Sequence, residues 1–440
     1  MLLAWGFLFY DMDIKNLHNI FIHSEGVCTD TRNISPGMVF FALKGDNFNG
    51  NKYAAQAIKK GAYYAVIDDP DYEISGKTLL VDNSLDALQK LAVHHRRLMP
   101  AKIIAITGSN GKTTTKELML SILKTYYQTT ATSGNLNNHI GVPLSILNIS
   151  DTTEFSIIEM GANHPGEIAK LCEIAQPDFG LITNVGRAHI EGFGSFEGVK
   201  KAKAELYRYL EKTEGVTFVN QDNSLLTQML GEQKTITYSF MSKEAFCRGQ
   251  HLTHQGYVGV RWKTKSMQGE CVSKLFGSYN AENILSAVCI AAYFNVPHDN
   301  INKAIEQYTP ANQRSEIKIT DNNELFLDMY NANPTSMELA IKHFYNNNKA
   351  QTLILGDMKE LGNTSHKFHR EILELINQMG FKEAYLCGPE FFKLKDAYDY
   401  HFVPDTDSLK LLLQKTDLSN RQILIKGSRS MQLELIIPYL

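Results

Sequence analysis

The stretch that decides the fold of this chain is IIAITGSNGKTTTKELMLSILK, residues 103–124. Its first four residues are apolar and predict a short buried strand, and residues 113–124 have the apolar spacing of an amphipathic helix. A polar loop with two glycines, residues 107–111, joins these two elements. A strand, a glycine-containing loop and a helix in this order are typical of a phosphate-binding loop in an α/β protein.

The residue types of this loop point to nucleotide binding. Its backbone N–H groups are expected to converge on phosphate oxygens, and the start of the helix adds a partial positive charge. Ile106 stands where the usual motif has its first glycine, so the spacing is a variant one. Lys112 is expected to bridge two phosphates, and the Thr113 hydroxyl to bind Mg²⁺. The predicted nucleotide-binding residues are Gly108, Ser109, Asn110, Gly111, Lys112, Thr113 and Thr114.

Downstream of the loop, strand and helix patterns alternate. Predicted strands at 155–158, 179–183 and 216–219 are interleaved with predicted helices at 166–175 and 197–211. This alternation favours a doubly wound, mostly parallel sheet with helices on both faces. Residues 235–276 change to an alternating β pattern, for which we expect an antiparallel insertion, and a helical stretch follows at 280–294.

The flanking segments predict two more α/β domains. Before the loop, strands are expected at 39–43 and 63–67, with a helix at 54–60. After residue 310, apolar runs predict a Rossmann-like domain without a dinucleotide signature, at 325–327, 352–355, 384–387 and 423–425. The expected organisation is therefore an N-terminal domain (1–100), a central phosphate-loop domain (101–309) and a C-terminal domain (310–440).

The composition excludes several other classes of protein. The 440 residues include 44 basic and 47 acidic ones, which leaves no basic excess for a nucleic acid. The six cysteines form no Cys-x-x-Cys pair, so we expect buried cysteines in a reducing compartment, the cytoplasm. The apolar start lacks the basic region and cleavage site of a signal peptide, and it is too short to span a membrane. We expect residues 1–11 to be a disordered or strand-like leader.

The loop resembles that of the Mur ligase family, and other motifs extend the resemblance over nearly the whole chain. They are GNLNN (134–138), EMGA (159–162), TNVGRAH (183–189), NAEN (280–283), DMYNANP (328–334), GDMKELG (356–362) and KGSR (426–429). The resemblance implies an ATP-dependent ligase that activates a carboxylate as an acyl phosphate before an amine displaces phosphate. Sister ligases commonly have a histidine just before the proline of the Asp328 motif. This chain has asparagines there instead. In this it resembles the family member that joins D-alanyl-D-alanine to UDP-N-acetylmuramoyl-tripeptide during peptidoglycan synthesis.

The resemblance also implies a metal site that holds two Mg²⁺ ions. Glu159 and His189 each follow a predicted strand, at the sheet edge where α/β proteins bind ligands. Lys203 matches a lysine that the family carbamylates with CO₂, and a carbamate offers the oxygen ligands that Mg²⁺ prefers. The alternative for Lys203 is a solvated helical lysine. The catalytic residues implied are Lys112, His189 and Lys203.

Further contacts are implied for ATP and for the substrates. Asn280 and Asn283 share a helix face, suited to holding adenine or ordering a loop, and Arg314 and Asp328 match ATP-contacting residues of the C-terminal domain. Thr31, Arg32 and Lys44 resemble elements that bind the uridine nucleotide, for which cations are suited. Asn138, Asn331 and Asn333 are the remaining expected substrate contacts, and Asn331 and Asn333 are the candidates for selecting the dipeptide. The family suggests a monomer, and no motif distinguishes lysine from diaminopimelate as the third peptide residue.

Three alternative functions agree less well with the sequence. Folylpolyglutamate synthetase shares the chemistry, but its loop typically reads Gly-Lys-Gly-Ser and it lacks the N-terminal uridine-nucleotide domain. A sister ligase that adds a single amino acid is disfavoured by the asparagines of the Asp328 motif. A nucleotide-gated binding module without ligase activity would be expected to lose Lys112, Glu159 or Lys203, and all three are present.

Overall fold

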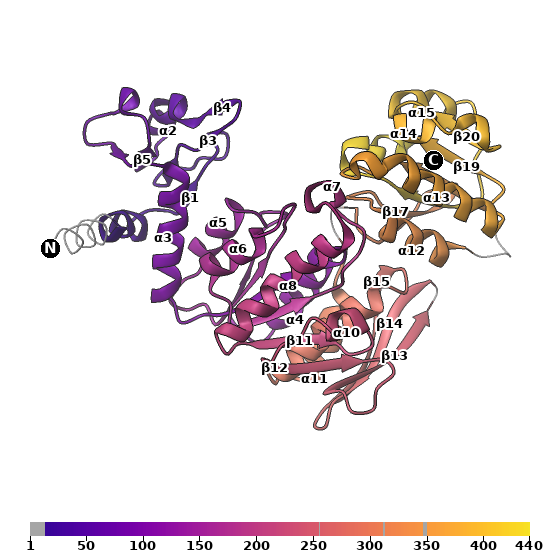
Figure 1. The fold of residues 1–440 in the computed structure, drawn as a ribbon, viewed down its shortest axis with the longest axis horizontal. Coiled ribbons are helices and arrows are strands. Elements are labelled where there is room, and N and C mark those ends of the chain that lie inside the picture. The colour runs from indigo at the N-terminus through magenta and orange to yellow at the C-terminus, as the bar shows by residue number, and fades with distance from the viewer. Residues whose placement is uncertain (1–13, 255, 311–312, 346–349) are drawn as a thin grey trace. The chain divides into compact units, whose positions relative to one another are not determined.

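The computed structural model describes residues 14–254, 256–310, 313–345 and 350–440 (Figure 1). The leader predicted for residues 1–11 lies outside the described residues. The chain divides into two compact units. Unit 1 comprises Met1–Ile106, Tyr127–Ala162 and Gly166–Gly180, and unit 2 comprises Thr107–Tyr126, Asn163–Pro165 and Leu181–Leu440. The three domain boundaries proposed from the sequence stay a prediction.

Unit 1 contains a small parallel sheet with the strand order β1-β2-β5-β6. These strands are Val27–Cys28, Val39–Phe41, Tyr64–Ile67 and Thr78–Leu80. The strands predicted at 39–43 and 63–67 are confirmed, and so is the helix at 54–60, which is α2 (Ala54–Lys59). Ala54 and Ala57 of α2 pack against Phe40 and Ile67 in a small core. The short pair β3 (Lys44–Gly45) and β4 (Phe48–Asn49) precedes this helix.

Helix α3 (Ser84–Leu98) ends this part of unit 1, and its limits have local causes. It begins where the Asn83 side chain accepts the N–H of Asp86, a helix cap of the usual kind. It ends before Met99, because Pro100 disfavours helical backbone at the residue that precedes it.

The central sheet has nine strands in the order β15-β14-β13-β12-β11-β10-β7-β9-β8. Its strands in chain order are β7 (Lys102–Thr107), β8 (Thr129–Ala131), β9 (Phe155–Glu159), β10 (Phe179–Ile182), β11 (Val216–Asn220), β12 (Lys234–Ser239), β13 (Cys247–His254), β14 (Tyr257–Lys263) and β15 (Gln268–Phe276). β7 and β8 both pair parallel with β9 in unit 1. The predicted strands at 103–106, 155–158, 179–183 and 216–219 are confirmed.

The expected antiparallel insertion at 235–276 is only partly right. β13, β14 and β15 are antiparallel neighbours, as expected. β12, however, pairs parallel with β11, and β13 pairs parallel with β12. These strands therefore continue the central sheet instead of forming a separate insertion, because the open edge of β11 offers the backbone partners that β12 needs.

The helices predicted at 113–124, 166–175, 197–211 and 280–294 are confirmed. They are α4 (Lys112–Leu123), α6 (Glu167–Ala175), α8 (Phe196–Lys212) and α10 (Asn280–Tyr293). The helices α5 (Gly141–Leu147), α7 (Ile190–Phe193), α9 (Ser224–Thr227) and α11 (His298–Gln307) were not predicted. α10 is buried around most of its circumference, as expected for a helix with apolar residues on all sides. It packs against α4 and β14, so the helix that begins at the phosphate loop is anchored in the core of unit 2.

A six-stranded sheet of order β16-β17-β21-β18-β19-β20 forms the C-terminal part of unit 2. Its strands are Glu316–Ile319, Asn323–Asp328, Gln351–Gly356, Ala384–Cys387, His401–Val403 and Arg421–Lys426, numbered β16 to β21. Only β16 pairs antiparallel, with β17. The predicted strands β17, β18, β19 and β21 are confirmed, and the edge strands β16 and β20 were missed.

Alternating residues of the inner strands supply two hydrophobic cores, one on each face of this sheet. Leu353 and Leu355 of β18 pack with α12 (Pro334–Phe344) and α13 (Ser365–Met379), whereas Ile354 packs on the other face with α15 (Thr406–Leu413). The short helix α14 (Pro389–Phe392) follows β19 (Figure 1). The α/β class with mostly parallel sheets is therefore confirmed.

The prediction of buried cysteines is confirmed. All six cysteines are buried, and none forms a disulfide bond. Within the described parts of the chain, no helix combines the length and apolar character needed to span a membrane.

Candidate functional site

The loop between β7 and α4 needs glycine at two positions. Gly108 and Gly111 have φ values of +143° and +81°, which residues with side chains rarely adopt. A Cβ on Gly108 would lie 2.0 Å from Thr183 Oγ1, and one on Gly111 would lie 2.5 Å from Asn283 Oδ1. Gly111 directly precedes α4, so this helix begins without a side-chain cap and leaves its first N–H groups for another acceptor. Such a helix start behind a tight loop suits an anion.

Residues 183–186 fix the backbone of the loop. The Ser109 hydroxyl accepts the N–H of Gly186 at 2.8 Å and donates to its carbonyl at 3.2 Å. The Asn110 N–H donates to Asn184 Oδ1 at 3.0 Å, and the Thr183 hydroxyl donates to Asn110 O at 2.6 Å. Protein groups therefore hold the loop in shape, and a ligand would meet dipoles that are already oriented.

Lys112 lies folded over the loop. Its Nζ donates to Gly108 O at 2.7 Å and to Ser109 O at 3.4 Å. Thr113 and Thr114 follow it and are buried in the first turn of α4. Phosphate oxygens are stronger acceptors than these neutral carbonyls, so an anion in the loop would compete for the ammonium group.

Asn280 and Asn283 lie at the start of α10, where both are buried. Asn283 Nδ2 donates to Asn280 Oδ1 at 2.8 Å, and Asn283 Oδ1 accepts the Thr115 hydroxyl at 3.2 Å. Asn280 Nδ2 donates to Phe276 O at 2.7 Å. Of the two tasks considered for this pair, these contacts favour ordering the loop over holding adenine.

The Asp328 segment, residues 328–334, reaches the phosphate loop through Asn333. Asn333 Nδ2 donates to Asn110 Oδ1 at 2.7 Å. Asn333 Oδ1 accepts the Ser336 N–H at 2.9 Å and thereby caps α12. These bonds give Asn333 a structural task at the loop, and its expected contact with the dipeptide stays a prediction. Asn331 is exposed, and its Oδ1 accepts the N–H of Ala332.

His189 contacts a carboxylate from the C-terminal part of unit 2. Its Nδ1 lies 2.5 Å from Glu360 Oε2, an ion-pair contact without the angle of a hydrogen bond. This contact, with the charges of His189 and Lys112, holds the pKa of the Glu360 carboxyl below its usual value, although burial opposes it. Both residues have positive φ, +52° and +64°, a backbone strain that tends to occur at functional sites.

Glu159 has a free carboxylate oxygen suited to a cation. The side chain is 1% exposed, and Asn137 Nδ2 donates to its Oε1 at 2.7 Å. Its Oε2 is buried and has no hydrogen-bond partner among the described residues. A buried anionic oxygen without a donor is costly, and a Mg²⁺ ion would satisfy it. The chemistry of this carboxylate therefore fits the metal that the sequence predicts.

Lys203 is 1% exposed, so the alternative of a solvated helical lysine is wrong. It lies on the buried face of α8, and its Nζ is 5.7 Å from the centre of the Phe193 ring. Carbamylation would convert this buried ammonium group to an oxygen donor, which Mg²⁺ prefers. Over the residues that the structure describes, no three His, Cys, Asp or Glu side chains gather into a metal site. The metal ligand set therefore stays a prediction.

Arg314 and Asp328 have partners of different kinds. Asp328 Oδ2 lies 2.5 Å from Nζ of Lys426, which is buried. The Arg314 guanidinium stacks on the Tyr330 ring, with 3.5 Å between its Cζ and the centre of the ring. The Nε of Arg314 is buried and has no hydrogen-bond partner in the described part of the chain. Arg314 thus keeps a donor for a ligand, whereas Asp328 is already paired.

The candidate residues of unit 1 are bound to neighbours or exposed. The Arg32 side chain is 86% exposed and pairs with Asp30, whose pKa it lowers to about 2 through hydrogen bonds. Lys44 Nζ lies 2.9 Å from Asp68 Oδ1. The Thr31 hydroxyl has a long contact of 3.4 Å to Gln56. Asn138 Oδ1 accepts the N–H of Gly141 at 2.9 Å, at the start of α5.

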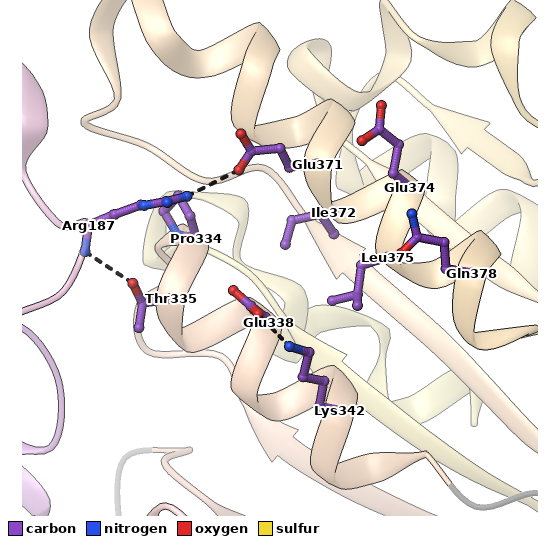
Figure 2. Close-up of a pocket in the computed structure, with 10 residues that line it drawn as sticks. All are labelled: Arg187, Pro334, Thr335, Glu338, Lys342, Glu371, Ile372, Glu374, Leu375 and Gln378. Atoms are coloured by element: carbon purple, nitrogen blue, oxygen red, sulfur yellow. Dashed lines mark hydrogen bonds and ion pairs between the residues drawn. The ribbon is translucent and has the colours of Figure 1, made fainter.

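A cavity of about 320 Å³ lies between α12 and α13, close to Arg187 (Figure 2). Arg187 donates through its backbone N–H to Thr335 Oγ1 at 3.0 Å, and its guanidinium lies 3.3 Å from Glu371. Glu338 and Lys342 form a second ion pair in the same cavity. Its charges largely neutralise each other, so the cavity gives no clear preference for a ligand.

Three residues that support the site were not predicted as functional residues. Asn137 holds Glu159, Glu360 contacts His189, and Lys426 pairs with Asp328. All three lie in motifs that resemble the Mur ligase family, GNLNN, GDMKELG and KGSR. Their residue type could have indicated a role, because each is a polar side chain in a family motif and had no predicted function.

Models of the Mur ligase family match most of the chain. The description "Mur ligase family, catalytic domain" matches residues 23–99, "Mur ligase middle domain" matches 106–291, and "Mur ligase, glutamate ligase domain" matches 313–429.

Individual proteins are similar over nearly the full length. The chain is 36% identical to the UDP-N-acetylmuramoyl-tripeptide–D-alanyl-D-alanine ligase of Haemophilus influenzae, over 94% of this chain and 93% of that protein. It is 34% identical to the ligase of the same name from Bacillus subtilis, over 94% and 92%. Among solved structures, MurF from Acinetobacter baumannii superposes with a TM-score of 0.84 at 28% identity, covering 94% and 92%. MurF ligase from Thermotoga maritima in complex with ADP superposes with a TM-score of 0.83 at 25% identity, covering 94% of this chain and 97% of that chain.

Proposed function

The chain belongs to the Mur ligase family, and we propose that it is the ATP-dependent ligase that joins D-alanyl-D-alanine to UDP-N-acetylmuramoyl-tripeptide. The product would be a precursor of peptidoglycan. The observation that carries the proposal is the phosphate loop, whose backbone is fixed by residues 183–186 and which lies at an uncapped helix start. The similarity to ligases of this name over 94% of the chain supports the choice of substrates.

The reaction has two steps. A carboxylate oxygen of the tripeptide attacks the γ-phosphorus of ATP, and ADP leaves with the bridging oxygen. The amine of the dipeptide then attacks the acyl carbon, loses a proton, and phosphate leaves with the former carboxylate oxygen. Negative charge gathers on the transferred phosphoryl group in the first step and on the leaving phosphate in the second. Stabilising that charge is therefore the main task of the site.

The residues of the loop suit this task. The N–H groups at the start of α4 and the ammonium of Lys112 supply positive charge where the phosphoryl group would lie. We assign the other ATP contacts to Ser109, Asn110, Thr114, Arg314 and Asp328. Asn280 and Asn283, at the start of α10, would order the loop. Arg314 suits a phosphate because its Nε lacks a partner within the described residues.

We propose that two Mg²⁺ ions are bound by Thr113, Glu159, His189 and carbamylated Lys203. Bound Mg²⁺ would neutralise charge on the phosphoryl oxygens. The buried, unsatisfied Oε2 of Glu159 and the burial of Lys203 support this assignment. Asn137 orients Glu159 by a hydrogen bond to its other oxygen.

The remaining parts of the proposal concern substrates and setting. Thr31, Arg32 and Lys44 would contact the uridine nucleotide, and Asn138, Asn331 and Asn333 would lie near the peptide substrates. We further propose a cytoplasmic monomer that binds no nucleic acid, which the near balance of 44 basic and 47 acidic residues supports.

Phosphate release tests the proposal. With ATP and Mg²⁺, the purified protein should release phosphate only when UDP-N-acetylmuramoyl-tripeptide and D-alanyl-D-alanine are both present. D-glutamate or a folate in place of the dipeptide should give no release above background. Strong release with either replacement would refute the substrate assignment.

A further inference from the structure

The hydrogen bond between Asn333 and Asn110 joins parts of the chain that are 223 residues apart. Asn333 is buried at the start of α12, and Asn110 lies in the phosphate loop. Both polar ends of the Asn333 side chain are committed. Its oxygen accepts the Ser336 N–H, so its NH₂ group is the end that points at Asn110.

This contact fixes the orientation of the Asn110 amide as well. Asn110 must turn its oxygen toward the NH₂ of Asn333, because two NH₂ groups cannot bond to each other. Its own NH₂ group is thereby turned the other way, where it is buried and has no acceptor among the described residues. A buried donor without an acceptor is destabilising, so an incoming oxygen that accepts from it gains a favourable hydrogen bond.

We infer that Asn333 is a positioning residue. It orients the Asn110 amide so that the NH₂ group of Asn110 donates a hydrogen bond to a phosphate oxygen of the bound nucleotide. The inference rests on the proposed function, because that function places the phosphates of ATP in this loop. It gives Asn333 a task in nucleotide binding, distinct from the dipeptide contact that the sequence suggested.

Substitutions at Asn333 separate this role from helix capping. Asp, Ser and Asn are all good helix caps, so capping alone predicts similar behaviour for Asn333→Asp and Asn333→Ser. The positioning role predicts a graded loss. Asn333→Ser removes the donor and leaves the Asn110 amide free to turn. Asn333→Asp replaces the donor with an acceptor, which favours the inverted Asn110 amide and presents its oxygen to the phosphate.

The experiment measures the affinity of a non-hydrolysable ATP analogue with Mg²⁺ by calorimetry, together with the KM for ATP and kcat. We expect the affinity to fall severalfold in Asn333→Ser and roughly tenfold to a hundredfold in Asn333→Asp, the range for a hydrogen bond to a charged group. Unfolding temperatures should stay close to that of the wild type. Asn83→Asp, the same change at the cap of α3, is the matched control and should bind the analogue normally.

A double-mutant comparison isolates the route through Asn110. In an Asn110→Ala background, Asn333→Asp should cause no further loss beyond about twofold, because the group it acts through is gone. Equal affinity in wild type, Asn333→Ser and Asn333→Asp would overturn the inference. A loss that persists in the Asn110→Ala background would also overturn it, since the aspartate would then act by direct repulsion. A wild-type protein that does not bind the analogue would refute the proposed function and this inference together, whereas normal turnover with unaffected variants would refute this inference alone.

Discussion

The phosphate loop of unit 2 and residues 30–44 of unit 1 offer cations for phosphate groups, but in very different surroundings. In the loop, Lys112 lies among backbone groups whose positions are fixed by Thr183, Asn184 and Gly186. In unit 1, the Arg32 side chain is 86% exposed and bonded to its chain neighbour Asp30. The same kind of residue is thus preorganised in one region and solvated in the other.

This difference has an energetic consequence. Charges that are oriented and shielded from water stabilise a developing charge strongly, because the protein pays no reorganisation at the moment of reaction. Exposed ion pairs are screened and are worth about 0–1 kcal/mol. We therefore expect substitutions in the loop to reduce the rate of chemistry, and substitutions in unit 1 to weaken substrate binding only modestly.

The largest effect is expected for Lys112→Ala. Turnover should fall by roughly a hundredfold or more, because a preorganised phosphoryl-stabilising charge is removed. The fold should be retained, since this side chain packs in no hydrophobic core. Lys124→Ala, which removes an exposed lysine just after the same helix, is the control and should keep normal turnover. A steady-state phosphate-release assay measures both, and near-normal activity of Lys112→Ala would place the phosphoryl site elsewhere.

Lys203→Ala tests whether burial marks function outside the loop as well. If the lysine carries a carbamate, the variant should be nearly inactive, and acetate or formate at high concentration should restore part of its activity by filling the vacated space. The same carboxylates should not help Lys112→Ala, whose lost group is a cation. Mass spectrometry of the intact wild type under CO₂ would look for the added carbamate. A Lys203→Ala enzyme with wild-type activity would refute the carbamate.

Gly108→Ala probes the rigidity of the loop itself. The new methyl group would lie 2.0 Å from Thr183 Oγ1 at a φ of +143°, so both a clash and backbone strain are expected. The free energy of unfolding should fall by more than about 1 kcal/mol, and ATP binding should weaken. Gly76→Ala is the matched control, because Gly76 also has a positive φ, whereas a Cβ added at this position would have no neighbour within 4 Å. Equal stability of the two variants in urea would show that the loop can relax.

The smallest effect is expected for Arg32→Ala. The KM for the uridine-nucleotide substrate should rise about two- to fivefold, the range for one exposed charge contact, with kcat unchanged. The effect should shrink at high salt, because exposed charges are screened. Arg97→Ala, at an exposed arginine of α3, serves as the control. A large fall in kcat for Arg32→Ala would remove the contrast between the two regions.

Much of the fold could be predicted because the inner strands are continuous apolar runs. β7, β9, β18 and β21 are of this kind and were placed within one or two residues. The missed strands β16 and β20 are short sheet edges with exposed residues, so their sequence carries little apolar signal. The parallel pairing of β12 with β11 was not predictable from an alternating pattern, since alternation shows which face is buried and not the direction of the neighbour.

The candidate site was predictable as a set of residue types, but its internal contacts were not. The partner of Asn110 is 223 residues away, and Asp328 and Lys426 are 98 apart, so only the fold brings these pairs together. Burial of Lys203 did have a local signal. Val199, Leu206 and Leu210 lie at helical spacing around it, which places the lysine on the apolar face of α8.

The central claim is that ATP activates the tripeptide carboxylate, and isotope transfer tests it most directly. UDP-N-acetylmuramoyl-tripeptide labelled with ¹⁸O in its terminal carboxylate is incubated with ATP, Mg²⁺, D-alanyl-D-alanine and the enzyme, and the released phosphate is analysed by mass spectrometry. The acyl-phosphate route predicts one ¹⁸O atom in each phosphate formed, because phosphate leaves with a former carboxylate oxygen. Unlabelled phosphate alongside a normal yield of ligated product would contradict the account.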